Sequence, residues 1–142
     1  MPENNIELAG NTNIKTSQVD KSVDTPADFT SPEVLYNKLI ETNPEFLKAY
    51  YNKAAMLMGM GDFMEASRTF FQLIKRNPDY YKAYLGIAMS FDKMEKYKDA
   101  IRYYKKFLEL KQFSEDAIFA RNRINELRAE YFSKDNSLTV IE

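Results

Sequence analysis

An internal repeat with a period of 34 residues constrains the fold of this chain more than any other feature. When residues 47–80 are aligned with residues 81–114, seven positions are identical, and most of these are alanine or aromatic. The identical pairs are Lys48/Lys82, Ala49/Ala83, Tyr50/Tyr84, Ala54/Ala88, Met60/Met94, Ala66/Ala100 and Arg68/Arg102. A period of this length is typical of a unit that stacks on its neighbours to bury a continuous core.

Each unit is predicted to consist of two helices joined by a tight turn. The apolar period predicts helices near 46–59, 63–76, 80–93 and 97–110. Met60-Gly61-Asp62 predicts the first turn, because glycine accepts the left-handed backbone that tight turns often need. Met94-Glu95-Lys96 has the same place in the second unit and is a less favourable turn sequence.

One helix is predicted before the two repeats and one after them. Thr30-Ser31-Pro32 is typical of a helix start and Asn43-Pro44 of a helix end, so the leading helix covers 31–43. A capping helix is predicted over 114–132. Its apolar line is expected to cover the open end of the stack and consists of Ala117, Ala120, Ile124, Leu127 and Tyr131. Its other side is expected to face solvent and carries Arg121, Arg123, Glu126, Arg128 and Glu130.

The two ends of the chain differ in composition from the repeats. Residues 1–30 are rich in Asn, Thr, Ser and Asp and contain a single aromatic residue, Phe29. A segment this polar cannot bury enough apolar surface to offset its ordering entropy, so we expect a disordered arm there. Residues 133–142 are expected to form a flexible tail, which leaves 31–132 as the folded domain.

The alanine and aromatic positions of the repeats resemble the tetratricopeptide repeat (TPR) family. The small positions are Ala54, Ala88, Ala66 and Ala100, and the bulky and aromatic positions are Tyr50, Tyr84, Leu57, Phe91, Phe70 and Tyr104. The resemblance implies an all-α solenoid of helical hairpins, with one leading helix, two full repeats over 47–80 and 81–114, and a C-terminal capping helix. In such a fold the alanines let helices approach closely while the rings fill the space between hairpins.

The complete absence of histidine and cysteine narrows the possible chemistry. It excludes thiolate nucleophiles, imidazole bases, Cys/His zinc sites and disulfides. The acidic residues lack EF-hand spacing, and there is no glycine-rich phosphate loop. We therefore expect a protein that is not an enzyme and that uses neither a cofactor nor a metal.

The overall charge and the hydropathy pattern indicate which partners to expect and where in the cell the protein is found. The formal net charge of −1 creates no strong field toward nucleic acids or anionic membranes, so a nucleic-acid partner is not expected. No apolar stretch is long enough to span a bilayer, and the first residues lack the pattern of a secretory signal. We expect a cytoplasmic protein.

The TPR resemblance also implies a binding surface, because the first helix of each repeat lines a concave groove in this family. The matching residues here are Lys48, Tyr51, Ala55, Met58, Lys82, Leu85, Met89 and Asp92. Two ammonium groups edge a strip of tyrosine and flexible methionine, so we expect a peptide or helix with an apolar anchor and acidic flanks to bind there. The protein would then act as a scaffold, assembly factor or chaperone-like adaptor. The alternative is that the methionines only pack against the neighbouring repeat.

One TPR subfamily holds the C-terminal carboxylate of heat-shock proteins in a clamp of Lys, Asn and Arg. Asn52 and Lys82 match two of the five clamp groups, while Gly86 stands where the arginine is expected. Two groups cannot form the full charge-assisted network, so heat-shock tail binding is not expected. Asn52 is kept as a candidate groove residue.

Two other functions are compatible with the sequence. Self-association is possible because about three repeats are normally needed for stability, and the leading helix lacks a hairpin mate. Single-stranded RNA binding is a remote alternative, suggested by basic residues among aromatic ones: Lys96, Lys98, Arg102, Lys105 and Lys106 with Tyr97, Tyr103 and Tyr104. A solvated face of helical charge pairs is the favoured interpretation of that stretch.

Overall fold

The computed structural model describes residues 31–141, and these residues form six helices and no strand. The helices are α2 (Pro32–Thr42), α3 (Leu47–Gly59), α4 (Phe63–Arg76), α5 (Tyr81–Lys93), α6 (Tyr97–Leu110) and α7 (Glu115–Ile141). The predicted helix ranges through residue 110 agree with α2–α6 to within one residue at each end. The disordered arm expected at 1–30 lies outside the described residues.

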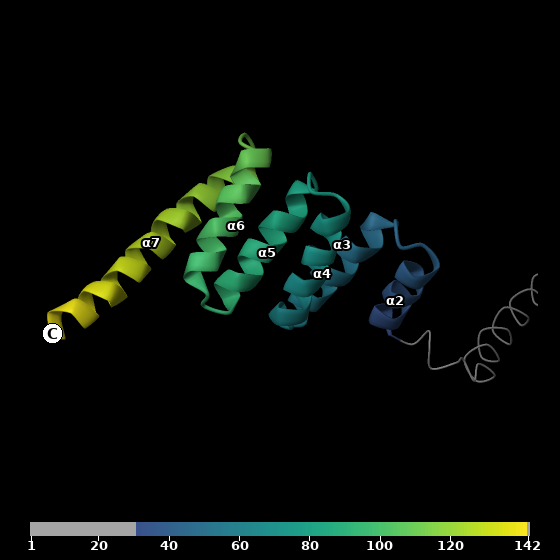
Figure 1. Ribbon diagram of the computed structural model, residues 1–142, viewed down its shortest axis with the longest axis horizontal. Coiled ribbons are helices and arrows are strands. Elements are labelled where there is room, and N and C mark those ends of the chain that lie inside the picture. The colour runs from purple at the N-terminus through teal and green to yellow at the C-terminus, as the bar shows by residue number, and fades with distance from the viewer. Residues whose placement is uncertain (1–30, 142) are drawn as a thin grey trace, which may run out of the picture.

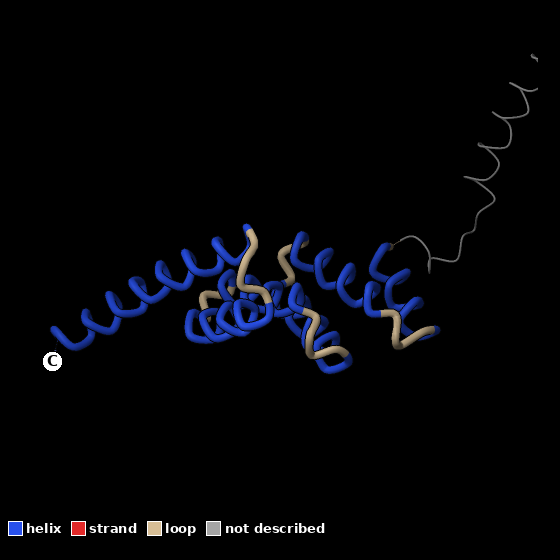
Figure 2. The backbone as a smooth tube through the Cα atoms, turned by 90° about the horizontal axis from the view of Figure 1, so that it is seen from above, coloured by secondary structure: helices blue, strands red, loops and turns tan. Residues whose placement is uncertain are grey.

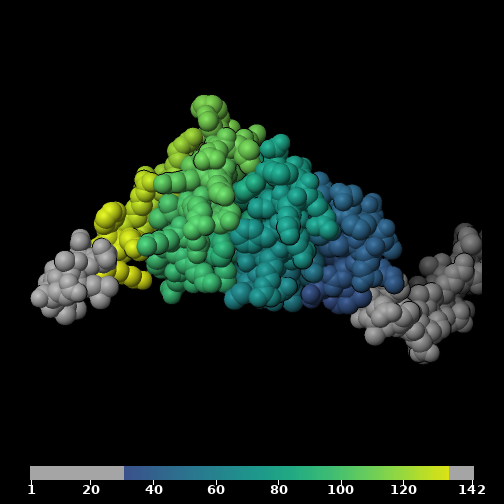
Figure 3. Space-filling view, viewed as in Figure 1, coloured from purple at the N-terminus to yellow at the C-terminus, as the bar shows by residue number. Residues whose placement is uncertain are grey.

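The helices stack side by side in the order of the chain, from α2 at one end to α7 at the other (Figures 1 and 3). Each helix contacts the next one, and α3 also contacts α5 directly. Seen from above, the chain reverses direction at each short loop as the stack advances (Figure 2). Contacts therefore join near neighbours only, which confirms the predicted all-α solenoid of helical hairpins.

The turns inside the two hairpins share one backbone shape but not one residue type. Gly61 has a φ of 84° in the first hairpin, and Glu95 has a φ of 59° at the equivalent place in the second. The Asp62 side chain accepts a hydrogen bond from the Glu65 amide and caps α4, whereas Lys96 gives α6 no side-chain cap. The second turn is therefore the less favourable one, as the sequence predicts.

The core consists of two hydrophobic clusters in which alanines pack beside aromatic rings and aliphatic side chains. The first cluster contains Tyr50, Ala54, Phe70, Leu73, Ala83 and Ile87, and the second contains Ala88, Ala100, Tyr104, Phe107, Ala117, Ala120, Ile124 and Leu127. Tyr50 and Tyr84 also donate equivalent hydrogen bonds, at 2.9 and 2.8 Å, to the carbonyls of Pro44 and Pro78 in the preceding turns. The repeat thus recurs in its hydrogen bonds as well as in its packing.

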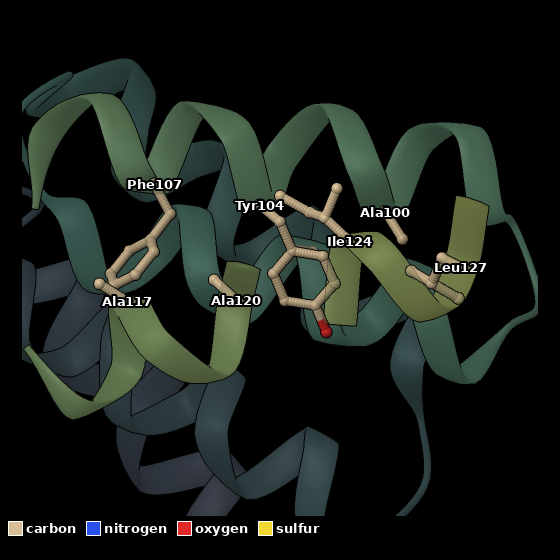
Figure 4. Packing of buried hydrophobic residues seen from close by; sticks show 8 residues of the cluster. Ala100, Tyr104, Phe107, Ala117, Ala120, Ile124 and Leu127 are labelled. Carbon is tan, nitrogen blue, oxygen red and sulfur yellow. The ribbon is translucent and has the colours of Figure 1, made fainter. Parts of the chain in front are cut away.

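The last helix is longer than predicted. Ala117, Ala120, Ile124 and Leu127 are buried against α6, as expected (Figure 4). However, α7 continues to Ile141, so the structure has helix where a flexible tail was predicted from residue 133. The physical reason is that no proline or glycine interrupts residues 115–141.

The prediction that Tyr131 covers the end of the stack is wrong. The Tyr131 side chain is 36% exposed. Since α6 has 14 residues and α7 has 27, the antiparallel pairing ends near the start of α6, and α7 runs on beyond it. Tyr131 instead lies beneath the Lys98 ammonium, 5.2 Å from the ring centroid.

Within the part of the chain that the structure describes, no helix is both long enough and apolar enough to cross a membrane.

Candidate functional site

The face formed by α3, α5 and α7, called the inner face below, carries the predicted site residues. On α3 the side chains of Lys48 and Ala55 are exposed, and those of Tyr51, Asn52 and Met58 are half-buried. They form a shallow row along α3, with the ammonium group at the N-terminal end of the helix.

The Tyr51 ring connects α3 to its two neighbours. It meets the Phe70 ring of α4 edge-on, with centroids 5.9 Å apart, and contacts the Tyr80 ring at 5.8 Å. Burial and the nearby Tyr51 phenol raise the pKa of Tyr80. Tyr80 in turn shares a pocket of about 230 Å³ with Lys82, just before and at the start of α5. The N-terminal ends of α3 and α5 therefore form one continuous edge of the inner face.

The apolar side chains predicted to line the groove are partly exposed to solvent and partly packed against the core. Leu85 and Met89 are half-buried and pack against the second cluster, while Met58 packs against the first. The alternative interpretation, that the methionines only pack against the neighbouring repeat, is therefore correct in part, because Met58 and Met89 both contact the core. Each still presents some of its surface to solvent on the inner face.

Asp92 is engaged by other side chains and is not an open acceptor in the groove. Its carboxylate receives two hydrogen bonds from the Arg123 guanidinium, at 2.7 and 2.8 Å, and one from the Tyr104 hydroxyl at 3.0 Å. Burial works against the charged form, but the bonds from Arg123 and Tyr104 outweigh it and lower the pKa of Asp92. Burial and the Asp92 charge raise the pKa of Tyr104.

The C-terminal half of the inner face contains a pocket of about 560 Å³ between α5, α6 and α7. Met89 and Asp92 line it from α5, and Phe119, Arg123 and Glu130 line it from α7. The Phe119 side chain is 44% exposed and meets the Tyr104 ring edge-on at 6.0 Å.

Sequence reasoning missed the contribution of α7 to the inner face. It placed Arg123 on a solvated outer side, whereas the structure turns Arg123 toward α5, with 26% of its side chain exposed. The signal was available, because Phe119 and Arg123 lie 34 residues after Leu85 and Met89. Extending the repeat by one more period would have found them.

The carboxylate clamp cannot be built at Gly86. A Cβ atom at this position would lie 2.4 Å from two atoms of the Phe70 ring, so the close approach of α4 and α5 requires glycine. An arginine there would force the two helices apart.

The basic helix α6 offers few rings to a nucleic acid. Tyr104 is fully buried, and Tyr97 and Tyr103 are half-buried. Arg102 forms an ion pair with Asp99 at 3.2 Å. Among the described residues, no group of three or more His, Cys, Asp or Glu is arranged to hold a metal ion.

The fold and this surface define a class of protein: an α-solenoid of helical hairpins with one face lined by alternate helices. Two family models, both described as tetratricopeptide repeat, match residues 35–66 and 81–113. The first match spans α2, α3 and the start of α4, and the second spans α5 and α6. The chain belongs to the tetratricopeptide repeat family, whose repeats generally form a non-catalytic protein-interaction fold.

Solved structures agree with this assignment. The TPR domain of Arabidopsis OM64 is 23% identical, with a TM-score of 0.61, over 82% of this chain and 88% of that one. The first TPR domain of human RPAP3 is 22% identical, with a TM-score of 0.64, over 91% of both chains. The N-terminal domain of STI-1 from C. elegans is 20% identical, with a TM-score of 0.63, over 83% of this chain and 95% of that one. No curated protein sequence matches the chain.

Proposed function

We propose that this protein is a non-catalytic interaction module whose inner face is a concave groove for a peptide or helix of a partner protein. The observation that carries the proposal is the row of half-buried apolar side chains from α3 and α5, edged by exposed lysines. The row consists of Tyr51, Met58, Leu85 and Met89, and the lysines are Lys48 and Lys82. In this role the protein acts as a scaffold, assembly factor or chaperone-like adaptor.

The chemistry of the row favours a particular kind of ligand. An apolar side chain laid against Tyr51 and Met89 would remove their remaining surface from water, at roughly 25 cal/mol per Å². Methionine adapts to irregular shapes, so the anchor can be aliphatic or aromatic. Lys48 and Lys82 have no ion-pair partner among residues 31–134, whose side chains the structure describes, so acidic flanks of the ligand complement them.

Two similar structures support a peptide ligand. The first TPR of Spaghetti (RPAP3), 20% identical with a TM-score of 0.63, is bound to the HSP90 peptide SRMEEVD. YrrB, 20% identical with a TM-score of 0.60, is described as a TPR protein with an unusual peptide-binding site. Since Gly86 excludes the clamp arginine, we expect this chain to bind through its apolar row and not through a terminal carboxylate.

The test is a selection of short random peptides displayed on phage against the full chain, followed by titration of the enriched peptides. We expect enrichment of an apolar centre flanked by Asp and Glu, and binding weakened at least about tenfold by Tyr51→Ala with Met89→Ala. The control is Met64→Ala with Leu110→Ala, which removes exposed apolar surface elsewhere. Equal binding by the two double variants would show that the groove is not the site.

Self-association remains a second candidate because α2 buries none of its residues within the described chain. Leu35 is 44% exposed and Phe46 is 41% exposed at this end of the stack. A second copy docked there would supply the missing repeat neighbour. Light scattering of the full chain and of Leu35→Glu tests this: a dimer that becomes a monomer supports it, and a monomer for both removes it.

A further inference from the structure

The face opposite the inner face has its own aromatic groove. Phe71 of α4 and Tyr103 of α6 meet edge-on with ring centroids 5.4 Å apart. Helix α5 lies between these two helices in the stack (Figure 1). Phe91 of α5 contacts both rings, at 6.2 and 5.7 Å. Three helices thus contribute one ring each to a single cluster.

This cluster is open to solvent along one side. Phe71, Phe91 and Tyr103 are all half-buried. A groove of about 470 Å³ borders the cluster at Phe71 and Tyr103, and it is lined by Phe71, Gln72, Ile74, Lys75 and Tyr103. It is separate from the 560 Å³ pocket, which is lined by other residues. We call it the outer groove.

The charge around the outer groove is strongly one-sided. Helices α4 and α6 together carry seven basic and three acidic residues, a net charge of +4 in a chain whose net charge is −1. Two of the acidic residues already pair on their own helix, Glu65 with Arg68 and Asp99 with Arg102. Lys75 lines the groove and has no ion-pair or hydrogen-bond partner among the side chains described, those of residues 31–134. The Lys106 ammonium lies 5.2 Å from the centroid of the Tyr103 ring.

We propose that the outer groove is a second interaction surface, which takes an acidic protein segment carrying one large apolar side chain. The apolar side chain packs on Phe71, Ile74 and Tyr103, and the acidic residues on either side of it pair with Lys75 and Lys106. Charge complementarity selects the ligand, because the surrounding helices attract an anionic segment and repel a basic one.

An acidic protein segment fits this groove better than a single-stranded nucleic acid does. Base stacking needs an aromatic face that is open to the base. Lys106 lies over the Tyr103 ring, and Phe71 and Phe91 pack against that ring as well. Phe71 is itself held edge-on in the cluster. The groove therefore offers apolar edges and ammonium groups, not a stacking platform.

The proposed test uses one synthetic peptide of Glu and Asp residues around a central Phe, and the same peptide with Ala in place of Phe. The full chain is compared with two variants of equal net charge: Lys75→Glu with Lys106→Glu at the outer groove, and Lys48→Glu with Lys82→Glu at the inner face. We expect the outer variant to weaken binding of the Phe peptide at least about tenfold, and the Ala peptide to bind the unaltered chain weakly.

A photo-cross-linking analogue in place of the peptide Phe locates the bound peptide, with the cross-links mapped by mass spectrometry. Cross-links to α4 and α6 that disappear in the outer variant support the proposal. Cross-links to α3 and α5 alone would overturn it while supporting the proposed function of the inner face. Polyuridylate binding more tightly than the Phe peptide would also overturn it.

Discussion

Asp92 of α5 and Arg123 of α7, which are 31 positions apart in the sequence, form a bidentate salt bridge. The guanidinium donates through Nε at 2.7 Å and through Nη2 at 2.8 Å to the two carboxylate oxygens. Its Nη1 atom donates to Glu126 at 2.8 Å, and the Tyr104 hydroxyl completes the network from α6. This network ties the last helix to the second repeat and forms one wall of the 560 Å³ pocket.

Loss of this pair is expected to destabilise the domain. Replacing Arg123 with Met leaves the Asp92 carboxylate, whose side chain is 13% exposed, without its main partner. We expect a loss of about 1–3 kcal/mol in the free energy of unfolding, measured by urea denaturation. Arg68→Met is the control, because its pair with Glu65 is exposed and is expected to change stability by less than about 1 kcal/mol.

Stability is expected to depend on pH through Asp92. Its pKa in the folded state lies below the ordinary value of 3.8 for an aspartate, so the unfolded state binds more protons around that pH. The stabilisation is therefore fully present above about pH 5 and is lost as the pH falls through the folded-state pKa. Urea denaturation at several pH values should show a shallower acid decline for Asp92→Asn than for the unaltered chain. An identical decline in both would contradict the prediction.

One substitution in the second hairpin turn is expected to raise the stability of the domain. Glu95 has a φ of 59°, where a non-glycine residue costs about 1 kcal/mol. We expect Glu95→Gly to stabilise the domain by about that amount in thermal or urea unfolding. Gly61→Ala is the reciprocal control in the first hairpin, where φ is 84°, and it should destabilise by a similar amount. A stabilising Gly61→Ala would argue against this explanation.

The contact between α4 and α5 depends on Gly86. An added Cβ would lie 2.4 Å from the Phe70 ring, so Gly86→Ala must displace a ring in the core. We expect a loss of about 1–3 kcal/mol in the free energy of unfolding. Gly59→Ala is a matched helical control, since nothing lies within 4 Å of its added Cβ, and it should be neutral or stabilising by up to about 1 kcal/mol. If both variants unfolded at the same urea concentration, close packing at Gly86 would not be the cause.

Much of the architecture follows from local patterns in the sequence. The period of the apolar residues and the prolines at 44 and 78 define helices α2–α6 to within a residue at each end. The same residues recur at an interval of 34, which predicts the stack and places Lys48, Tyr51, Lys82 and Met89 on its inner helices. These are properties of single helices and of their repetition, so they need no knowledge of distant contacts.

Other features were decided only by the tertiary structure. The ion-pair partner of Asp92 depends on where α7 crosses α5. The exposure of Tyr131 depends on where α6 begins. The outer groove likewise depends on the contact between α4 and α6, whose Phe71 and Tyr103 rings line it. The sequence by itself determined the helices, the repeat and the candidate inner face. The relative placement of helices, set by close packing of side chains far apart in the chain, decided which charges are paired and which apolar surfaces stay open.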